Sequence, residues 1–312
     1  VLRKLENMSI LCIFENKNVA PWKKALTEKL PAATIEVYPN VKDALAVDFV
    51  ICWKPKNKVF EQFPNIKVVQ SVGASIAHIT DSQTLHTDPI ITRVVDEKLS
   101  NDMWEFLITV VLSELKNMRT YAAQQALGIW EQQRYRSIQN TTVSILGLGS
   151  IGGFVAEKFA QMGFQVKGWS TSKKELLKVQ SYAGENEFDA FLKNTDFLIN
   201  LLPLTDRTKG ILNKAVFQKV PKNAFLINVG SGAHVVVADL IDQLDRNQLA
   251  GAFLDVFREE PLPKTHPFWK HPKIQITPHV ASLTNVDRAT DQITENYRRF
   301  LKKETLLNRV SL

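Results

Sequence analysis

The sequence predicts an α/β protein of two domains, one built on a doubly wound parallel sheet and the other a smaller α/β unit. Two observations support this prediction. Short apolar runs alternate with helix-like segments along most of the 312 residues, as in parallel sheets covered by helices. One apolar run, residues 142–146, ends in three glycines spaced G-x-G-x-x-G and leads at once into a helical pattern.

The first hundred residues predict the smaller domain. Strand-like runs occupy residues 9–14, 34–38, 48–53, 66–72 and 90–95. Helical patterns fall at residues 21–30, where Pro21 takes a helix-start position, and at residues 41–46. The last helical pattern, residues 285–302, is long enough to return onto this domain. We therefore expect one domain of residues 1–97 with 284–312, and a second of residues 98–283.

A single long helix is predicted from residue 97 to residue 127, ending near Gly128. Apolar residues recur along it at helical spacing. We expect it to cross between the two domains, and its apolar face is a candidate for a homodimer interface.

The second domain reads as repeated strand–helix units. Its six predicted strands are residues 142–147, 164–170, 197–202, 224–229, 251–256 and 274–277. The helices between them are predicted at residues 151–161, 189–194, 214–219 and 236–246. Six strands with intervening helices fit a doubly wound, Rossmann-type sheet, which binds ligands at the carboxyl ends of its strands.

The glycine turn predicts a dinucleotide site. Gly147 permits a sharp turn, Gly149 lets the backbone approach a pyrophosphate, and Gly152 lets the helix pack on the strand. The helical pattern begins at Ile151, just after Ser150, so the free N–H groups and positive dipole end there would face the phosphates. The alternative is an ordinary structural turn, because glycines also mark turns without ligands.

The end of the next strand favours NADP over NAD. An NAD site needs a carboxylate about 20 residues beyond the glycines to bind the ribose 2′-hydroxyl. Ser170 stands there instead, followed by hydroxyl and amine side chains that suit a 2′-phosphate. These residues are Thr171, Ser172, Lys173 and Lys174. NAD binding stays open, with these residues as a solvated turn.

Composition excludes several other classes. Apolar content of 45% with 23% charged residues is typical of a soluble globular protein, and we find neither a run of about 18 apolar residues nor a signal-peptide pattern. The two cysteines, Cys12 and Cys52, lie in strand-like runs, which predicts reduced thiols and a cytoplasmic protein. We expect no metal site and no membrane association.

The net charge of +7 raises the question of nucleic-acid binding. Lysines and arginines cluster at residues 54–58 and 298–303. The clusters are short, far apart and without interleaved aromatic residues, so we interpret them as solvated surface and expect no nucleic-acid partner. A basic balance also suits an anionic cofactor and substrate.

Three further motifs follow predicted strands of the second domain. They are residues 226–232 (LINVGSG), 253–263 (FLDVFREEPLP) and 276–282 (ITPHVAS). With the glycine turn, the LPLT run at residues 202–205 and the WSTS run at residues 169–172, they make the sequence similar to the D-isomer-specific 2-hydroxyacid dehydrogenase family over residues 8–312. Within that family the sequence most resembles the glyoxylate/hydroxypyruvate reductase A branch.

The resemblance implies a fold and a reaction. The fold would be a Rossmann-type domain with a smaller flavodoxin-like α/β domain, assembled as a homodimer. The reaction would be NAD(P)-dependent hydride transfer to small 2-oxo acids. His279 would be the acid/base that protonates the substrate carbonyl, and Glu260 would pair with it and hold it protonated.

The remaining roles also come from the resemblance. Asp255 would contact the nicotinamide carboxamide. The cofactor would further lie along Leu202, Pro203, Asn228, Val229 and Gly230. Backbone N–H groups of Gly73, Ala74 and Ser75 would bind the substrate carboxylate, with Trp53 and Met103 lining the substrate cleft. The other five histidines carry no such motif and are expected to be ordinary core or surface residues.

The sequence departs from the family pattern in its substrate half. Ser231 stands where the family has an arginine that binds the substrate carboxylate and carbonyl, and Ser75 stands at a usual glycine. Three explanations remain open for Ser231: another cation, with Arg93 and Arg258 as candidates; a poorly active site or a different ligand; or a change introduced at this position. A nucleotide-binding regulator with little or no turnover is therefore the alternative to an active reductase.

Overall fold

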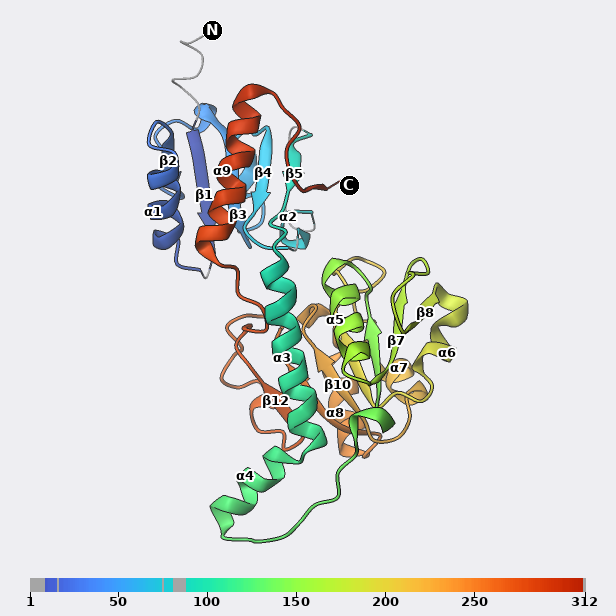
Figure 1. The fold of residues 1–312 in the computed structure, drawn as a ribbon. Coiled ribbons are helices and arrows are strands. Elements are labelled where there is room, and N and C mark those ends of the chain that lie inside the picture. The colour runs from blue at the N-terminus through green and yellow to red at the C-terminus, as the bar shows by residue number, and fades with distance from the viewer. Residues whose placement is uncertain (1–8, 16, 75, 81–87, 311–312) are drawn as a thin grey trace. The chain divides into compact units, whose positions relative to one another are not determined.

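The computed structural model describes residues 9–15, 17–74, 76–80 and 88–310 (Figure 1). Two compact units form: residues 1–97 with 284–312, and residues 98–283. Both are α/β units built on parallel sheets, so the predicted fold class is confirmed.

Among the described residues, the first unit contains a six-stranded sheet in the order β13-β5-β4-β3-β1-β2. Its parallel strands are β1 (Ser9–Phe14), β2 (Thr34–Val37), β3 (Val47–Trp53), β4 (Val68–Ser71) and β5 (Ile90–Thr92). Five of the strands have the flavodoxin-like order 2-1-3-4-5. The chain's last strand, β13 (Arg309–Val310), pairs antiparallel with β5 and was not predicted.

Helices cover this sheet. They are α1 (Ala20–Lys29), α2 (Ala77–Thr80) and α9 (Val286–Lys302), with short 3₁₀ turns at Ala44–Ala46 and Val59–Gln62. Figure 1 shows α1 and α9 side by side on one face of the sheet. The predicted helix at residues 41–46 shrinks to the 3₁₀ turn, because Asp43 caps it at Leu45 and β3 starts at Val47.

The second unit contains, within the described chain, a seven-stranded parallel sheet in the order β12-β11-β10-β9-β6-β7-β8. The strands are β6 (Thr142–Leu146), β7 (Gln165–Ser170), β8 (Val179–Ala183), β9 (Phe197–Asn200), β10 (Ala224–Asn228), β11 (Leu249–Leu254) and β12 (Ile274–Ile276). Read from β8, the order is 3-2-1-4-5-6 plus one strand. All strands are parallel, but successive strands are added on one side of β6 up to β8 and on its other side from β9 onward.

Strand β8 was missed in the sequence. It reads VQSYA, is half-exposed and pairs only with β7 at the edge of the sheet. An edge strand with one neighbour lacks the continuous apolar run that marks a buried parallel strand.

Helices pack on both faces of the second sheet. They are α3 (Glu97–Leu115), α5 (Ser150–Gln161), α6 (Phe188–Leu192), α7 (Lys214–Lys219) and α8 (Val237–Asp245), with 3₁₀ turns at Ile138–Asn140, Glu185–Glu187, Gly232–His234 and Pro267–Trp269. Alternate side chains of β9 pack on opposite faces of the sheet. Phe197 and Ile199 pack in the core that contains α3 and α5, and Leu198 packs in the core on the opposite face. Each such fully buried side chain contributes roughly 1.5–3 kcal/mol, so strand alternation itself specifies the two-sided packing.

The predicted long helix at residues 97–127 is wrong as a single element. Helix α3 ends at Leu115, and Asn117 adopts the left-handed conformation (φ 55°) before α4 (Met118–Leu127) begins. Asparagine accepts that conformation better than most residues, which explains the break. The apolar face of α3 packs in the core of the second unit, through Leu107 and Val111 among others.

Helix α4 buries no residue, and the extended residues 129–137 follow it back toward the unit (Figure 1). We call α4 with residues 128–137 the arm. Its exposed apolar side chains are Met118, Leu127, Ile129, Trp130 and Tyr135. In the described residues no helix is long and apolar enough to cross a membrane.

Candidate active site

The glycine turn has the geometry that its spacing predicts. Gly147 has a φ of +99°, and a Cβ there would lie 2.8 Å from the Leu201 carbonyl oxygen. At Gly152 a Cβ would lie 1.8 Å from the Gly147 carbonyl oxygen, so only glycine lets α5 pack this close to β6. Around Gly149, in contrast, nothing lies within 4 Å of the Cβ position. This glycine is therefore not required by the packing of the chain itself.

A surface hollow lies beside this turn. It is lined by Leu148, Gly149, Ser150, Gly153, Phe154, Glu157, Lys174, Glu175 and Leu176. Helix α5 starts here with Gly149 as its N-cap, and neither a capping side chain nor an acidic residue occupies its first turn. The N–H groups at Ser150 and Ile151 are thus placed to meet an anion. The hollow, the turn and the helix end together fit a dinucleotide pyrophosphate.

The residues after β7 differ in whether their side chains already bind other residues or line the hollow. Ser170 is buried, and its hydroxyl donates to the Ser172 carbonyl oxygen at 2.7 Å, which shapes the turn. The ammonium of Lys173 pairs with Glu187 at 2.8 Å, whereas Lys174 lines the hollow. Thr171 is exposed. Lys174 is therefore better placed than Lys173 for a phosphate group.

A buried polar network joins the ends of β9 and β10. The Asn200 amide nitrogen donates to Asn228 Oδ1 at 2.8 Å and to His234 Nδ1 at 2.7 Å. Since Nδ1 accepts, the proton is on His234 Nε2, which donates to the Pro203 carbonyl oxygen at 3.3 Å. Asn228 Nδ2 in turn donates to the Ser231 carbonyl oxygen at 2.8 Å. The network fixes the Leu202–Pro203 and Gly230–Ser231 segments together.

Sequence reasoning missed this role for His234, which was expected to be an ordinary residue, and for Asn200. A signal was present for Asn200, a polar residue that ends the apolar run of β9. His234 lies in a 3₁₀ turn before an apolar run, and its sequence context gave no comparable signal. Burial lowers the pKa of His234 from its ordinary value of 6.5 to about 4. The imidazole is therefore neutral at physiological pH, as its acceptor role at Nδ1 requires.

His279 and Glu260 meet. His279 Nδ1 lies 2.8 Å from Glu260 Oε2, and the imidazole is 37% exposed while the carboxylate is 20% exposed. The second oxygen of Glu260 accepts from the Phe257 N–H at 3.0 Å, which fixes the carboxylate to its own loop. A partly exposed histidine oriented by a carboxylate is the arrangement that proton transfer needs.

Asp255 holds the loop that carries His279. Its carboxylate is buried and accepts from Thr277 Oγ1 at 2.6 Å, from the Val280 N–H at 2.8 Å and from the Ala281 N–H at 2.9 Å. The Asp255 carbonyl oxygen accepts from the His279 N–H at 2.9 Å. His279 itself has a positive φ of 58°, a strained conformation that these bonds stabilise.

Ser231 does not supply a cation and instead starts a 3₁₀ turn. Its hydroxyl accepts from the Ala233 N–H at 3.3 Å. The next residue, Gly232, packs on the loop of the second motif (residues 253–263), since a Cβ there would lie 2.3 Å from the Arg258 backbone nitrogen. Arg258, one of the candidate cations, is an exposed side chain.

In the first unit, Trp53 and the Gly73–Ala74 segment are in contact. A Cβ on Gly73 would lie 2.8 Å from the Trp53 ring. The Gly73 N–H donates to Ser71 Oγ at 3.3 Å, and Arg93 donates to the Ala74 carbonyl oxygen at 3.3 Å. Arg93 therefore helps to hold the backbone of this segment in place. Ser75, predicted to bind the substrate carboxylate, lies outside the described residues.

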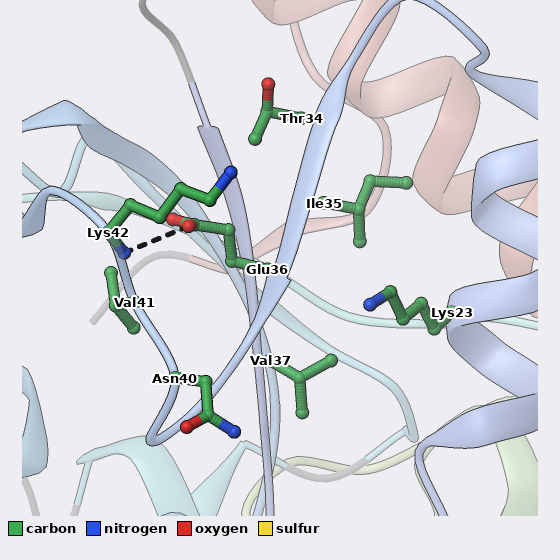
Figure 2. Close-up of a pocket in the computed structure, with 8 residues that line it drawn as sticks. All are labelled: Lys23, Thr34, Ile35, Glu36, Val37, Asn40, Val41 and Lys42. Carbon is green, nitrogen blue, oxygen red and sulfur yellow. Dashed lines mark hydrogen bonds between the residues drawn. The ribbon is translucent and has the colours of Figure 1, made fainter.

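A buried methionine and a second surface hollow lie apart from the residues described above. Met103, predicted to line the cleft, is buried in the core of the second unit. A second hollow runs along the edge strand β2, between Lys23 of α1 and Lys42 (Figure 2). Glu36 there accepts from the Lys42 N–H at 3.0 Å, and no residue predicted for the site lines it. No potential metal-binding group of three or more histidine, cysteine or acidic residues occurs in the part of the chain that the structure describes.

Residues 108–281 match the sequence model of the D-isomer-specific 2-hydroxyacid dehydrogenase NAD-binding domain. A glyoxylate/hydroxypyruvate reductase A of Yersinia enterocolitica is 36% identical over 280 residues, covering 88% of this chain and 89% of that protein. The enzyme of the same name from Serratia proteamaculans is 36% identical over 294 residues, covering 93% and 94%.

Solved structures of proteins from the same family are also similar to this chain. The NADPH-dependent glyoxylate/hydroxypyruvate reductase of Sinorhizobium meliloti, in complex with NADP and sulfate, superposes with a TM-score of 0.90 at 32% identity, over 97% of this chain and 98% of that one. A D-isomer-specific 2-hydroxyacid dehydrogenase of Xanthobacter autotrophicus, in complex with NADPH and MES, gives a TM-score of 0.89 at 32% identity, with the same coverage.

The chain therefore belongs to the D-isomer-specific 2-hydroxyacid dehydrogenase family, whose members are NAD(P)-dependent oxidoreductases. The resemblance stated from the motifs is confirmed.

Proposed function

We propose that the protein is an NADPH-dependent reductase of small 2-oxo acids of the glyoxylate and hydroxypyruvate type. The observation that carries the proposal is the His279–Glu260 pair, 2.8 Å apart, on a loop held by Asp255 in the same unit as the dinucleotide turn. The bound nicotinamide would supply a hydride to the carbonyl carbon of the substrate. The product is the corresponding 2-hydroxy acid.

The protein's own part in the reaction is proton transfer. As the carbonyl carbon gains the hydride, its oxygen gains negative charge and takes a proton from the Nε2 side of His279. Glu260, paired at Nδ1, orients the imidazole and stabilises the protonated ring that donates this proton. Asp255 keeps the loop in place, and a direct contact between Asp255 and the nicotinamide carboxamide remains part of the proposal.

The preference for NADPH is supported by the end of β7. No carboxylate stands at Ser170, and Lys174 lines the hollow beside the glycine turn. An introduced carboxylate would repel a 2′-phosphate and accept from a 2′-hydroxyl. We therefore expect Ser170→Asp to shift the preference from NADPH toward NADH by at least about tenfold in kcat/KM, since one charge-assisted contact corresponds to roughly 1.5–3 kcal/mol.

The direct test mixes purified protein, NADPH and glyoxylate or hydroxypyruvate, and follows the absorbance of the reduced nicotinamide. Turnover that is faster with NADPH than with NADH supports the proposal. No turnover by the natural sequence, together with turnover by Ser231→Arg, would contradict present activity while keeping the architecture of the site.

A nucleotide-binding regulator is the second candidate, and Ser231 is the observation that favours it. The position of the family arginine offers only a neutral hydroxyl that already caps a turn. This candidate predicts NADPH binding by calorimetry, no turnover with any 2-oxo acid, and a protein partner recovered with the NADPH complex.

A homodimer is proposed on the arm rather than on the apolar face of α3, which is buried. Trp130 is 98% exposed and Leu127 is 73% exposed, an unusual concentration of apolar surface for a segment with no buried residue. Trp130→Glu should convert a dimer into a monomer in sedimentation velocity. Exposed Leu45 in the first unit, changed to Glu, is the matched control and should leave the dimer intact.

A cytoplasmic location is proposed from the thiols. Cys12 and Cys52 are both buried and free, on the neighbouring strands β1 and β3. Burial raises the pKa of Cys12 to about 12, so the thiol is protonated and unreactive, as a reducing compartment permits.

A further inference from the structure

The loop between β7 and β8, residues 171–178, contributes to the hollow beside the glycine turn. Lys174, Glu175 and Leu176 of this loop line the hollow, and so does Glu157 of helix α5. The loop forms neither helix nor strand, and all of its residues except Leu176 are exposed. An exposed segment of this kind keeps one conformation only if specific contacts hold it.

Two side chains from the flanking elements accept hydrogen bonds from the backbone of this loop. Glu157 Oε1 accepts from the Leu177 N–H at 3.1 Å. Ser181 Oγ, on β8, accepts from the Lys174 N–H at 2.9 Å. The two bonds lie at either end of the loop segment that lines the hollow, so together they fix its backbone.

The same segment also packs on α5. The side chain of Leu176 packs against the core of the second unit, and a Cβ on Gly153 would lie 3.7 Å from its Cδ2 atom, an ordinary van der Waals distance. Directly before β8, Lys178 has a positive φ of 58°. A lysine keeps that unfavourable conformation only where its surroundings enforce it. The loop is therefore held in place by the protein itself.

The two lysines of the loop differ in their charged partners. Lys173 pairs with Glu187, whose other oxygen accepts from the Ala183 N–H at 2.7 Å. The hydrogen bond from Lys173, and then that from Ala183, lower the pKa of the Glu187 carboxyl, so the pair stays ionised at neutral pH. Lys174 has no ion-pair partner in the part of the chain that the structure describes. Its ammonium is therefore the one left to meet an anion at the hollow.

We propose that Glu157 and Ser181 are positioning residues for the 2′-phosphate of NADPH, because they hold the loop that presents Lys174. This inference rests on the NADPH preference of the proposed function. A loop that is already ordered loses less conformational entropy when a ligand binds, so its anchors raise the affinity for the group that the loop contacts. Glu157 thus favours binding through its hydrogen bond, although its charge alone would repel a phosphate.

Fluorescence titration with NADPH and with NADH tests this assignment through Glu157→Ala. We expect the NADPH dissociation constant to rise about three- to tenfold, as for loss of one hydrogen bond, and the NADH constant to change less than about twofold, because NADH lacks the 2′-phosphate. Glu157→Gln keeps an acceptor oxygen and should retain the natural affinity. Tighter NADPH binding by both variants would show that Glu157 acts only through its charge and would overturn the inference.

A second variant and a control accompany this test. Ser181→Ala removes the other acceptor and should weaken NADPH binding in the same selective way. Glu185→Ala removes the same charge as Glu157→Ala from an exposed position of the same unit that does not line the hollow. It should change neither dissociation constant.

Hydrogen exchange of the cofactor-free protein checks the anchor itself. The Leu177 amide should exchange faster in Glu157→Ala than in the natural protein or in Glu157→Gln. Unchanged exchange, unchanged NADPH affinity, or an equal weakening of NADPH and NADH in Glu157→Ala overturns the inference and leaves the NADPH preference standing. Equal affinity of the natural protein for the two cofactors overturns both. Selective loss of NADPH binding in Glu157→Ala, without reduction of glyoxylate by the natural protein, supports the inference and contradicts only the proposed reaction.

Discussion

The two units handle charged and polar groups in opposite ways. In the second unit Asn200, Asn228 and His234 satisfy one another, and Asp255 accepts three hydrogen bonds from the loop that carries His279. In the first unit the ammonium groups of Lys17 and Lys54 lie 4.6 Å and 5.8 Å from the centroid of the Trp53 ring. A network in which each polar group is satisfied gives a rigid, preorganised site, whereas cations beside an aromatic ring are held by weaker cation–π attraction.

The comparison identifies the second unit as the preorganised one. It fixes the groups that we propose are aligned for hydride and proton transfer. The four predictions that follow test this preorganisation, from the largest expected effect to the smallest.

The glycine turn gives the largest expected effect. A Cβ at residue 152 would lie 1.8 Å from the Gly147 carbonyl oxygen, so Gly152→Ala should destabilise the second unit by several kcal/mol or prevent its folding. Gly149→Ala meets no atom within 4 Å, so its melting temperature should be unchanged while NADPH affinity falls. Thermal unfolding and NADPH calorimetry on both variants measure this. Equal melting temperatures for both variants would refute the account of the turn.

Ser231→Arg tests the missing cation. Residue 231 has an extended backbone (φ −151°) that accepts any side chain, and the lost cap costs only about 1 kcal/mol. If the positive charge at this position limits the transition state, kcat/KM for glyoxylate should rise by roughly 10²–10³. A rise of less than about threefold would mean that positive charge at this position does not limit the reaction.

Acidification should destabilise the second unit through His234. Its pKa is about 4 in the folded protein and 6.5 ordinarily, so below pH 6.5 the unfolded chain binds more protons. Stability is therefore retained at neutral pH and falls as the pH drops from about 6.5 toward about 4. Between pH 7 and pH 5 the loss from this group is about 2 kcal/mol. Urea unfolding at the two pH values, compared with His234→Gln, measures it; an equal acid loss in the variant would exclude His234 as the cause.

The lysines after β7 give the smallest expected effect. Lys174 lines the hollow, so Lys174→Met should weaken NADPH binding about three- to tenfold, as for one exposed charge near a phosphate. Lys173 is already paired with Glu187, and Lys173→Met should change affinity less than twofold. Fluorescence titration with NADPH distinguishes them. The reverse order of effects would place the 2′-phosphate at Lys173.

Much of the second unit could be predicted from the sequence because its determinants are local. Spacing places Gly147 and Gly152, and continuous apolar runs mark the buried strands. The motif register pairs Glu260 rather than Glu259 with His279, and the structure has that contact. Motifs made of consecutive residues form the expected local structure because the end of a strand and the turn after it are adjacent in the chain.

The parts that sequence reasoning missed depend on distant residues. His234 looks unremarkable until β9 brings Asn200 beside it, 34 positions earlier in the chain. Lys17 and Trp53 are brought together only by the parallel pairing of β1 with β3. The break at Asn117 depends on one left-handed residue, and helical periodicity does not detect it.

The role of His279 in proton transfer is tested most directly by the kinetic constants of His279→Gln with NADPH and glyoxylate. The account predicts that His279→Gln lowers kcat by roughly 10²–10⁴ with KM within about threefold, because proton transfer is lost. If His279→Gln retains full kcat, the account is contradicted.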